Sequence, residues 1–245
     1  EGRSQHARDE PQRQRDEGED HVVLGDRVDE VEHEGAEVDL RHLDAAQAYL
    51  DDYVAQYQAL GLAAARPYVT FAQGQLALRR GLAAQALPQF ARAMRQLGAG
   101  NTEGRMLFLT ETGRAHLDAG DAAAALAATR RACDLHRVAG FPSVSAIDRG
   151  DMWWRHSQAL RACGHEAEAS EALAQAWRFV LDSVASLSDE GLRRNVLNKP
   201  AATREIVAAW LAHAREHRLP REQREAHLAG AANLSEPFER LVDTG

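Results

Sequence analysis

The feature that most constrains the fold of this chain is a spacing of small and apolar residues that occurs three times. Within each copy, steps of seven, five, four and three residues separate five positions. The copies are Gly74, Gly81, Ala86, Phe90 and Ala93, then Gly113, Gly120, Ala125, Thr129 and Ala132, then Ser157, Gly164, Ala169, Leu173 and Ala176. Agreement at five places in three copies is hard to obtain by accident, so the spacing indicates a structural repeat.

The residue types explain the spacing if each copy is a pair of helices. The first small residue lies on the first helix, where the second helix packs too closely for a larger side chain. The Gly that follows ends this helix, because glycine adopts the left-handed C-cap conformation without a Cβ clash. The next Ala lies buried where the helices cross, and the last two positions lie on the inner stripe of the second helix. Such a hairpin cannot bury its apolar face alone, so the copies are expected to stack.

These hairpins resemble tetratricopeptide repeats. Gly74 and Gly113 match the small residue of the family's first helix, and Ser157 is a tolerated substitute. Trp153 matches the bulky aromatic residue four places earlier, whereas Thr129 is a poor fit for a large apolar position. The resemblance implies an all-α fold, an α-solenoid of tetratricopeptide-like helical hairpins with long helices.

The resemblance covers roughly residues 66–180, and the repeat length departs from the family. The copies recur at 39 and 44 residues, compared with about 34 in the family, so longer helices or connections are expected. Stretched repeats of this kind are similar to those of large bacterial signalling and regulatory proteins. The resemblance therefore implies an interaction module from such a protein.

The chain divides into three predicted segments. Residues 1–40 contain 14 Asp and Glu and 5 Arg and predict a disordered acidic tail, although a segment that is not natural coding sequence is a second interpretation. Residues 41–220 predict the solenoid, with an incomplete leading hairpin and with C-terminal capping helices, one of them N-capped by Ser188. Residues 221–245 predict a linker and the first helix of a downstream domain, in a segment that resembles the start of a GAF sensor.

Charge and cysteine content exclude several classes of function. The formal net charge is −8, but outside the tail the chain has 24 basic and 23 acidic residues. This balance argues against nucleic-acid binding, which needs a basic excess. No apolar stretch is long enough for a membrane span or a signal peptide. Cys133 and Cys163 are too few for a disulfide framework, which favours a cytoplasmic setting.

One motif points to chemistry. His213, Glu216 and His217 follow the H-x-x-E-H order of inverted zinc peptidases, with both His on one helix face. A catalytic zinc needs three protein ligands, so His227 or Glu222 would have to be the third. The alternative is a solvated helix face, and we favour it. No phosphate-binding or nucleophile motif is present in the sequence, so we expect neither catalysis nor a cofactor nor a metal.

The remaining candidate site is the concave side of the stacked hairpins, which the first helices line. The positions predicted to line it are Tyr68, Phe71, Gln75, Arg79, Leu107, Thr110, Arg114, Asp118, Asp151, Trp154, Gln158 and Arg161. Aromatic, Arg and amide side chains favour peptide recognition, with the Arg residues supplying charge and the aromatic residues supplying apolar anchors. The alternative is that Tyr68, Phe71 and Trp154 only pack between repeats. The acidic tail is a candidate internal competitor for this groove.

The expected function is therefore a non-catalytic protein–protein interaction module that holds a protein or peptide segment. The resemblance implies the input or scaffold region of a bacterial signal-transduction or transcription-regulating protein. An alternative is a fragment of a multidomain signalling enzyme, a nucleotide cyclase, diguanylate cyclase or kinase, whose catalytic domain lies outside this chain. A zinc hydrolase that uses His213, Glu216 and His217 is a more remote alternative.

Overall fold

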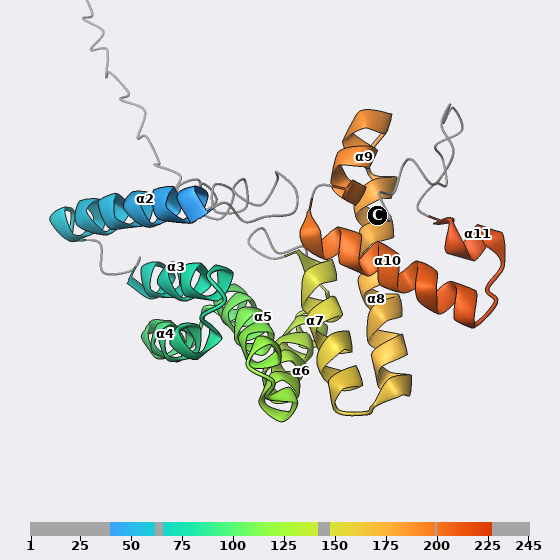
Figure 1. The fold of residues 1–245 in the computed structure, drawn as a ribbon, viewed down its shortest axis with the longest axis horizontal. Helices are drawn as coiled ribbons and strands as arrows, with labels where there is room; N and C mark the ends of the chain where they lie inside the picture. The colour runs from blue at the N-terminus through green and yellow to red at the C-terminus, as the bar shows by residue number, and fades with distance from the viewer. Residues whose placement is uncertain (1–39, 62–65, 142–147, 199, 227–245) are drawn as a thin grey trace, which may run out of the picture.

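The structure is a computed structural model that describes residues 40–61, 66–141, 148–198 and 200–226 (Figure 1). Within these ranges every regular element is a helix, which confirms the all-α prediction. The helices are α2 (Leu40–Ala59), α3 (Arg66–Arg79), α4 (Ala83–Gln96), α5 (Thr102–Asp118), α6 (Ala122–Val138), α7 (Arg149–Ala162), α8 (Glu166–Ala185), α9 (Glu190–Asn198), α10 (Ala201–Glu216) and α11 (Arg221–Arg224). The predicted tail up to residue 39 and the predicted first helix of a downstream domain lie outside the described residues.

Three pairs of consecutive helices form hairpins: α3 with α4, α5 with α6, and α7 with α8 (Figure 1). A connection of three residues joins the two helices of each pair. Each hairpin also packs against the next, through α4 with α5 and α6 with α7. At the N-terminal side α2 contacts α3, and at the C-terminal side α10 crosses both α7 and α8. The three sequence copies therefore correspond to three hairpins that contact one another in chain order.

The glycine that ends each first helix adopts the predicted conformation. Gly81, Gly120 and Gly164 have φ angles of +73°, +79° and +79°. In the first turn, the N–H of Gly81 donates to the Leu78 carbonyl at 2.9 Å, and the N–H of Leu82 donates to the Ala77 carbonyl at 2.9 Å. The same pair of hydrogen bonds occurs in the other two turns. This is the left-handed C-cap, in which glycine avoids the strain of a Cβ atom.

Close packing explains the small residues inside the first helices. A Cβ atom on Gly74 would lie 2.6 Å from Cε1 of Phe90, and one on Gly113 would overlap Cγ2 of Thr129. In the third hairpin the Ser157 hydroxyl donates to the Ala169 carbonyl at 2.7 Å. The predicted crossing residues are fully buried, as are the two inner positions that follow in each copy: Ala86, Phe90, Ala93, Ala125, Thr129, Ala132, Ala169, Leu173 and Ala176.

Thr129 stands where the repeat predicts an apolar residue, and the polar contacts of its hydroxyl group explain why it fits there. Its hydroxyl lies 3.0 Å from the Ala125 carbonyl and 3.0 Å from Nδ1 of His156, which belongs to the next hairpin. Both side chains are buried. A hydrogen-bonded pair of this kind avoids the cost of burying a polar group without a partner. The junction between the second and third hairpins is therefore partly polar.

Two details differ from the sequence-based expectations. The leading element, predicted as an incomplete hairpin, is the single helix α2, which is joined to the end of α3 by an ion pair of 3.0 Å between Asp44 and Arg80. The capping residue of α9 is Asp189, which accepts a hydrogen bond from the Leu192 N–H at 2.8 Å, so the assignment of Ser188 was wrong by one residue. An Asp side chain at the N-cap also interacts favourably with the helix dipole.

Candidate functional site

The first helices α3, α5 and α7 carry the twelve positions predicted to line a binding groove, and the structure separates them by exposure. The residues that reach solvent at least in part are Tyr68, Gln75, Arg79, Leu107, Arg114, Asp118, Asp151, Gln158 and Arg161. The other three, Phe71, Thr110 and Trp154, have exposed fractions of only 4%, 2% and 6%. The prediction that these three line an open surface is therefore wrong.

Two of the buried side chains, Phe71 and Trp154, contact another helix, and the third forms a hydrogen bond within its own helix. The ring of Phe71 stacks on Phe108 of the next hairpin, with ring centroids 4.2 Å apart and an interplanar angle of 14°. The Thr110 hydroxyl donates to the Met106 carbonyl within its own helix at 2.9 Å. Trp154 is buried, and its Nε1 donates to Oε2 of Glu205 on α10 at 2.6 Å. The alternative interpretation, that these side chains pack between helices, holds for Phe71 and Trp154.

A charged network joins α7 to α10 beside Trp154. The Arg155 side chain is only 9% exposed, and its Nη1 donates to the same Glu205 oxygen at 2.9 Å. Its Nε forms an ion pair with Asp151 at 2.9 Å, and Nη1 also donates to Gln158 at 3.0 Å. Because both Asp151 and Glu205 neutralise this guanidinium, it has little remaining attraction for a partner. We regard Arg155 as a structural cation.

Glu111 of α5 is a buried carboxyl group that sequence reasoning missed. Its residue is 7% exposed, and among the described residues its carboxyl oxygens do not belong to the fully buried polar atoms that lack a hydrogen-bond partner. Burial raises the pKa of Glu111, the Arg114 guanidinium opposes this rise, and the Asp151 carboxylate adds to it. Register offers a signal in retrospect, since Glu111 and Arg155 lie two residues before Gly113 and Ser157 and so occupy the same place in consecutive hairpins.

Arg114 lies one helical turn after Glu111 and is partly exposed. It has no hydrogen bond and no ion pair in the part of the chain that the structure describes. In register it corresponds to Gln75 on α3 and Gln158 on α7, each of which follows the small residue of its own copy. Hydrogen-bonding side chains therefore occupy the same place on three successive first helices.

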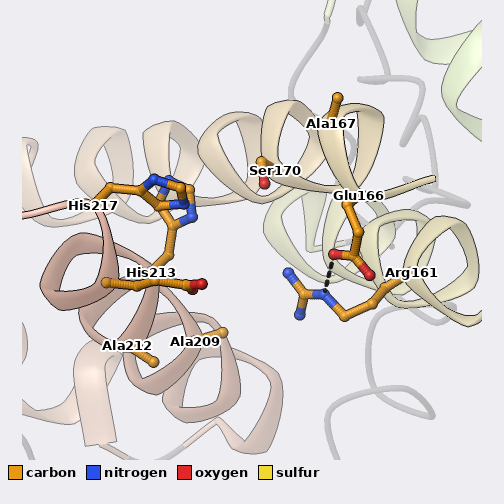
Figure 2. A pocket seen from close by; sticks show the side chains of 9 residues that line it. Arg161, Glu166, Ala167, Ser170, Ala209, Ala212, His213 and His217 are labelled. Atoms are coloured by element: carbon orange, nitrogen blue, oxygen red, sulfur yellow. Dashed lines mark ion pairs between the residues drawn. The ribbon is translucent and has the colours of Figure 1, made fainter. Parts of the chain in front are cut away.

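A separate pocket of about 530 Å³ lies between α10 and the adjoining ends of α7 and α8 (Figure 2). Its lining consists of Arg161, Glu166, Ala167, Ser170, Ala209, Ala212, His213, Glu216 and His217. Figure 2 shows the rings of His213 and His217 side by side at the C-terminal end of α10, with centroids 4.3 Å apart. On the other side of the pocket, Arg161 forms an ion pair with Glu166 at 3.5 Å. Arg161, which was predicted to line the groove, therefore lines this pocket.

No family model matches this chain, and neither does any curated protein or solved structure. The function therefore has to be argued from the geometry.

The pocket brings together the three residues of the H-x-x-E-H motif. Burial lowers the pKa of His213, the neighbouring His217 lowers it further, and Glu216 opposes this fall. A catalytic zinc needs a third protein ligand, and the described residues contain no group of three or more His, Cys, Asp or Glu that could hold a metal ion. Glu222 is among the residues searched, and His227 lies outside them.

Two further groups can be placed. Cys133 is fully buried on α6, and burial raises the pKa of its thiol, which disfavours the thiolate that nucleophilic attack requires. Among the helices that the structure describes, none has the length and apolar character needed to cross a bilayer.

Proposed function

We propose that this chain is a non-catalytic interaction module in which tetratricopeptide-like hairpins form an α-solenoid. Three observations support the proposal: hairpins that contact one another in chain order, left-handed Gly caps at equivalent places, and close contacts at the first small residue of each copy. Stacked units of this kind expose a continuous row of first-helix side chains. Such a surface is best suited to binding a protein segment along the row.

The bound partner, in this proposal, is an acidic protein segment. The observation that carries it is Arg114, a partly exposed guanidinium without a hydrogen bond or ion pair among the described residues. Guanidinium groups pair bidentately with carboxylates, which makes Arg the preferred side chain for this recognition. Gln75 and Gln158 lie at the same register on the neighbouring first helices and supply amide groups for the partner's main chain.

A binding assay tests the proposal. A short fluorescent peptide of Glu and Leu is titrated with the full chain, and anisotropy reports the affinity. Arg114→Gln should weaken binding by about tenfold or more, since a charge-assisted hydrogen bond contributes roughly 1.5–3 kcal/mol. Added salt should also weaken it. Arg131→Gln is the matched control, because Arg131 is exposed on the second helix α6. Equal affinities for the two variants would contradict the proposal.

The wider biological role rests on the family resemblance. We propose that the module is the input or scaffold region of a bacterial signal-transduction or transcription-regulating protein in the cytoplasm. A region of a multidomain cyclase or kinase would use the same surface. The zinc hydrolase is not proposed, since the described residues offer two imidazoles and no third ligand.

A further inference from the structure

Charge is distributed unevenly along the helical part of the chain. Residues 53–102, which include the first hairpin of α3 and α4, contain five Arg and no Asp or Glu. Residues 103–226, by contrast, contain 17 basic and 17 acidic residues. The first hairpin is therefore basic, and its arginines have no acidic partner within the hairpin itself.

Three helix ends meet at the end of this hairpin that lies away from the turn between α3 and α4. The start of α3 is joined to the end of α4 by the Thr70 hydroxyl, which donates to Oε1 of Gln96 at 2.9 Å. The start of α5 is joined to α3 by its capping residue Asn101, whose amide donates to the Tyr68 hydroxyl at 2.7 Å. Two of the three ends are helix N-termini, which carry partial positive charge and attract anions.

Four arginines lie at these helix ends, and together they form what we call the basic end: Arg66, Arg92, Arg95 and Arg105. Arg66 is exposed at the first position of α3. Arg92 and Arg95 are exposed near the end of α4 and, three residues apart, share one face of it. Arg105, in the first turn of α5, has a buried Nε without a hydrogen-bond partner among the described residues. The acid in this turn, Glu103, leaves an excess of positive charge.

The chain contains an acidic segment close to this hairpin in sequence. Residues 28–39 hold six Asp and Glu and no Lys or Arg, and α2 follows them directly. An ion pair of 3.0 Å between Asp44 and Arg80 holds the start of α2 at the other end of α3. The 14 residues of α3 span about 21 Å, whereas twelve extended residues span up to about 40 Å. The acidic segment is therefore long enough to reach the basic end.

We propose that residues 28–39 dock on the basic end of their own chain, where their carboxylates pair with the four guanidinium groups. Arginine suits this contact because it pairs bidentately with carboxylates. One exposed ion pair contributes little, but the connection through α2 raises the effective concentration of the segment to about the millimolar range, so several weak pairs suffice. The basic end shares no residue with the predicted groove, and the inference therefore goes beyond the binding proposed at Arg114.

Distances between two spin labels, measured by electron paramagnetic resonance, test the docking in the full chain. The labels are attached at Val31→Cys, in the acidic segment, and at Ala99→Cys, in the exposed connection between α4 and α5. Cys163 is replaced by Ser, and Cys133 is fully buried. A population of short distances is expected at low salt. Salt at 1 M, where the Debye length is about 3 Å, should remove this population.

Two pairs of substitutions test the assignment to the basic end. Arg92→Gln with Arg95→Gln should lower the ratio of docked to undocked chains by about threefold or more, because two ion pairs are lost. Arg131→Gln with Arg178→Gln is the matched control, since both arginines are exposed on the second helices α6 and α8. The control pair should leave the ratio unchanged. Circular dichroism checks that each variant is folded, and the salt titration needs no arginine variant.

Three results would overturn the inference. The first is an absence of short distances at low salt. The second is a ratio that the substitutions at Arg92 and Arg95 change no more than the control pair does, because the segment then binds elsewhere. The third is a short distance between singly labelled chains in a mixture, which would place the segment on a second copy. The assay of Arg114 decides the proposed function separately.

Discussion

The close contact between Gly113 and Thr129 supports a prediction about the substitution Gly113→Ala. Its effect on the free energy of unfolding should change sign when Thr129 is also replaced. A Cβ atom on Gly113 would overlap Cγ2 of Thr129, while the nearest backbone atom, the Ala125 carbonyl oxygen, is 3.5 Å away. The Thr129 methyl group cannot rotate away at low cost, because its hydroxyl bonds both Ala125 and His156. The steric conflict therefore involves one methyl group and no backbone.

Two opposing contributions set the magnitude. Gly→Ala in a helix interior stabilises by about 1 kcal/mol through propensity, but overpacking a core costs about 1–3 kcal/mol. We expect Gly113→Ala to destabilise the chain by about 1 kcal/mol. Thr129→Ser removes Cγ2, keeps the hydroxyl and costs about 1 kcal/mol for the lost methyl group. In that background Gly113→Ala meets no clash and should stabilise by about 1 kcal/mol.

Urea unfolding followed by circular dichroism, under reducing conditions, gives the four free energies of the cycle. The expected coupling between the two substitutions is about 2 kcal/mol, well above the roughly 0.5 kcal/mol within which independent sites add. Additive free energies would refute the packing of α5 on α6 described here. Gly98→Ala serves as the control, because no atom lies within 4 Å of a Cβ at that position, and it should change little.

Three further predictions concern other parts of the fold. Ala125→Leu should lower stability by about 1–3 kcal/mol in urea unfolding, because Ala125 is fully buried at a helix crossing. Glu205→Ala should destabilise by about 1–3 kcal/mol, since it removes one of the two acids that neutralise the buried Arg155, whereas Glu168→Ala, at an exposed ion pair, should shift the melting temperature little. Burial lowers the pKa of His156 from 6.5 to about 4. The free energy of unfolding should therefore be highest above about pH 6.5 and should fall by up to about 3 kcal/mol as the pH drops towards 4. The urea midpoint of His156→Gln should depend less on pH.

The sequence predicted those features that depend on local sterics. A left-handed helix cap and a position beneath a crossing helix each accept few residue types. The roles of Gly81 as a cap and of Gly113 as a crossing residue could therefore be predicted from the sequence alone. The helices followed from these positions and from the apolar stripe of each second helix. The same reasoning identified the buried Ala residues, because small size at a fixed step has no other local explanation.

Exposure on the first helices could not be predicted in the same way. Trp154 is covered partly by α10, whose Glu205 lies about fifty residues later in the chain, and Phe71 is covered by Phe108 of the next hairpin. Such coverage depends on how units pack on one another, and helical periodicity within one unit does not determine it. Tyr68 shows the intermediate case, since it is only half-buried although its hydroxyl accepts a hydrogen bond from Asn101 at 2.7 Å.

Residues that repeat and residues that differ carry different information in this chain. The place two residues before the first small residue is Ala72 in the first hairpin, Glu111 in the second and Arg155 in the third, and all three are buried. The helical fold accepts each of them, so the fold does not select which one is present. In the third hairpin the Arg is neutralised by Asp151 and Glu205. The register of the repeat therefore determines that this place is buried, whereas the chemistry of its side chain differs from one hairpin to the next.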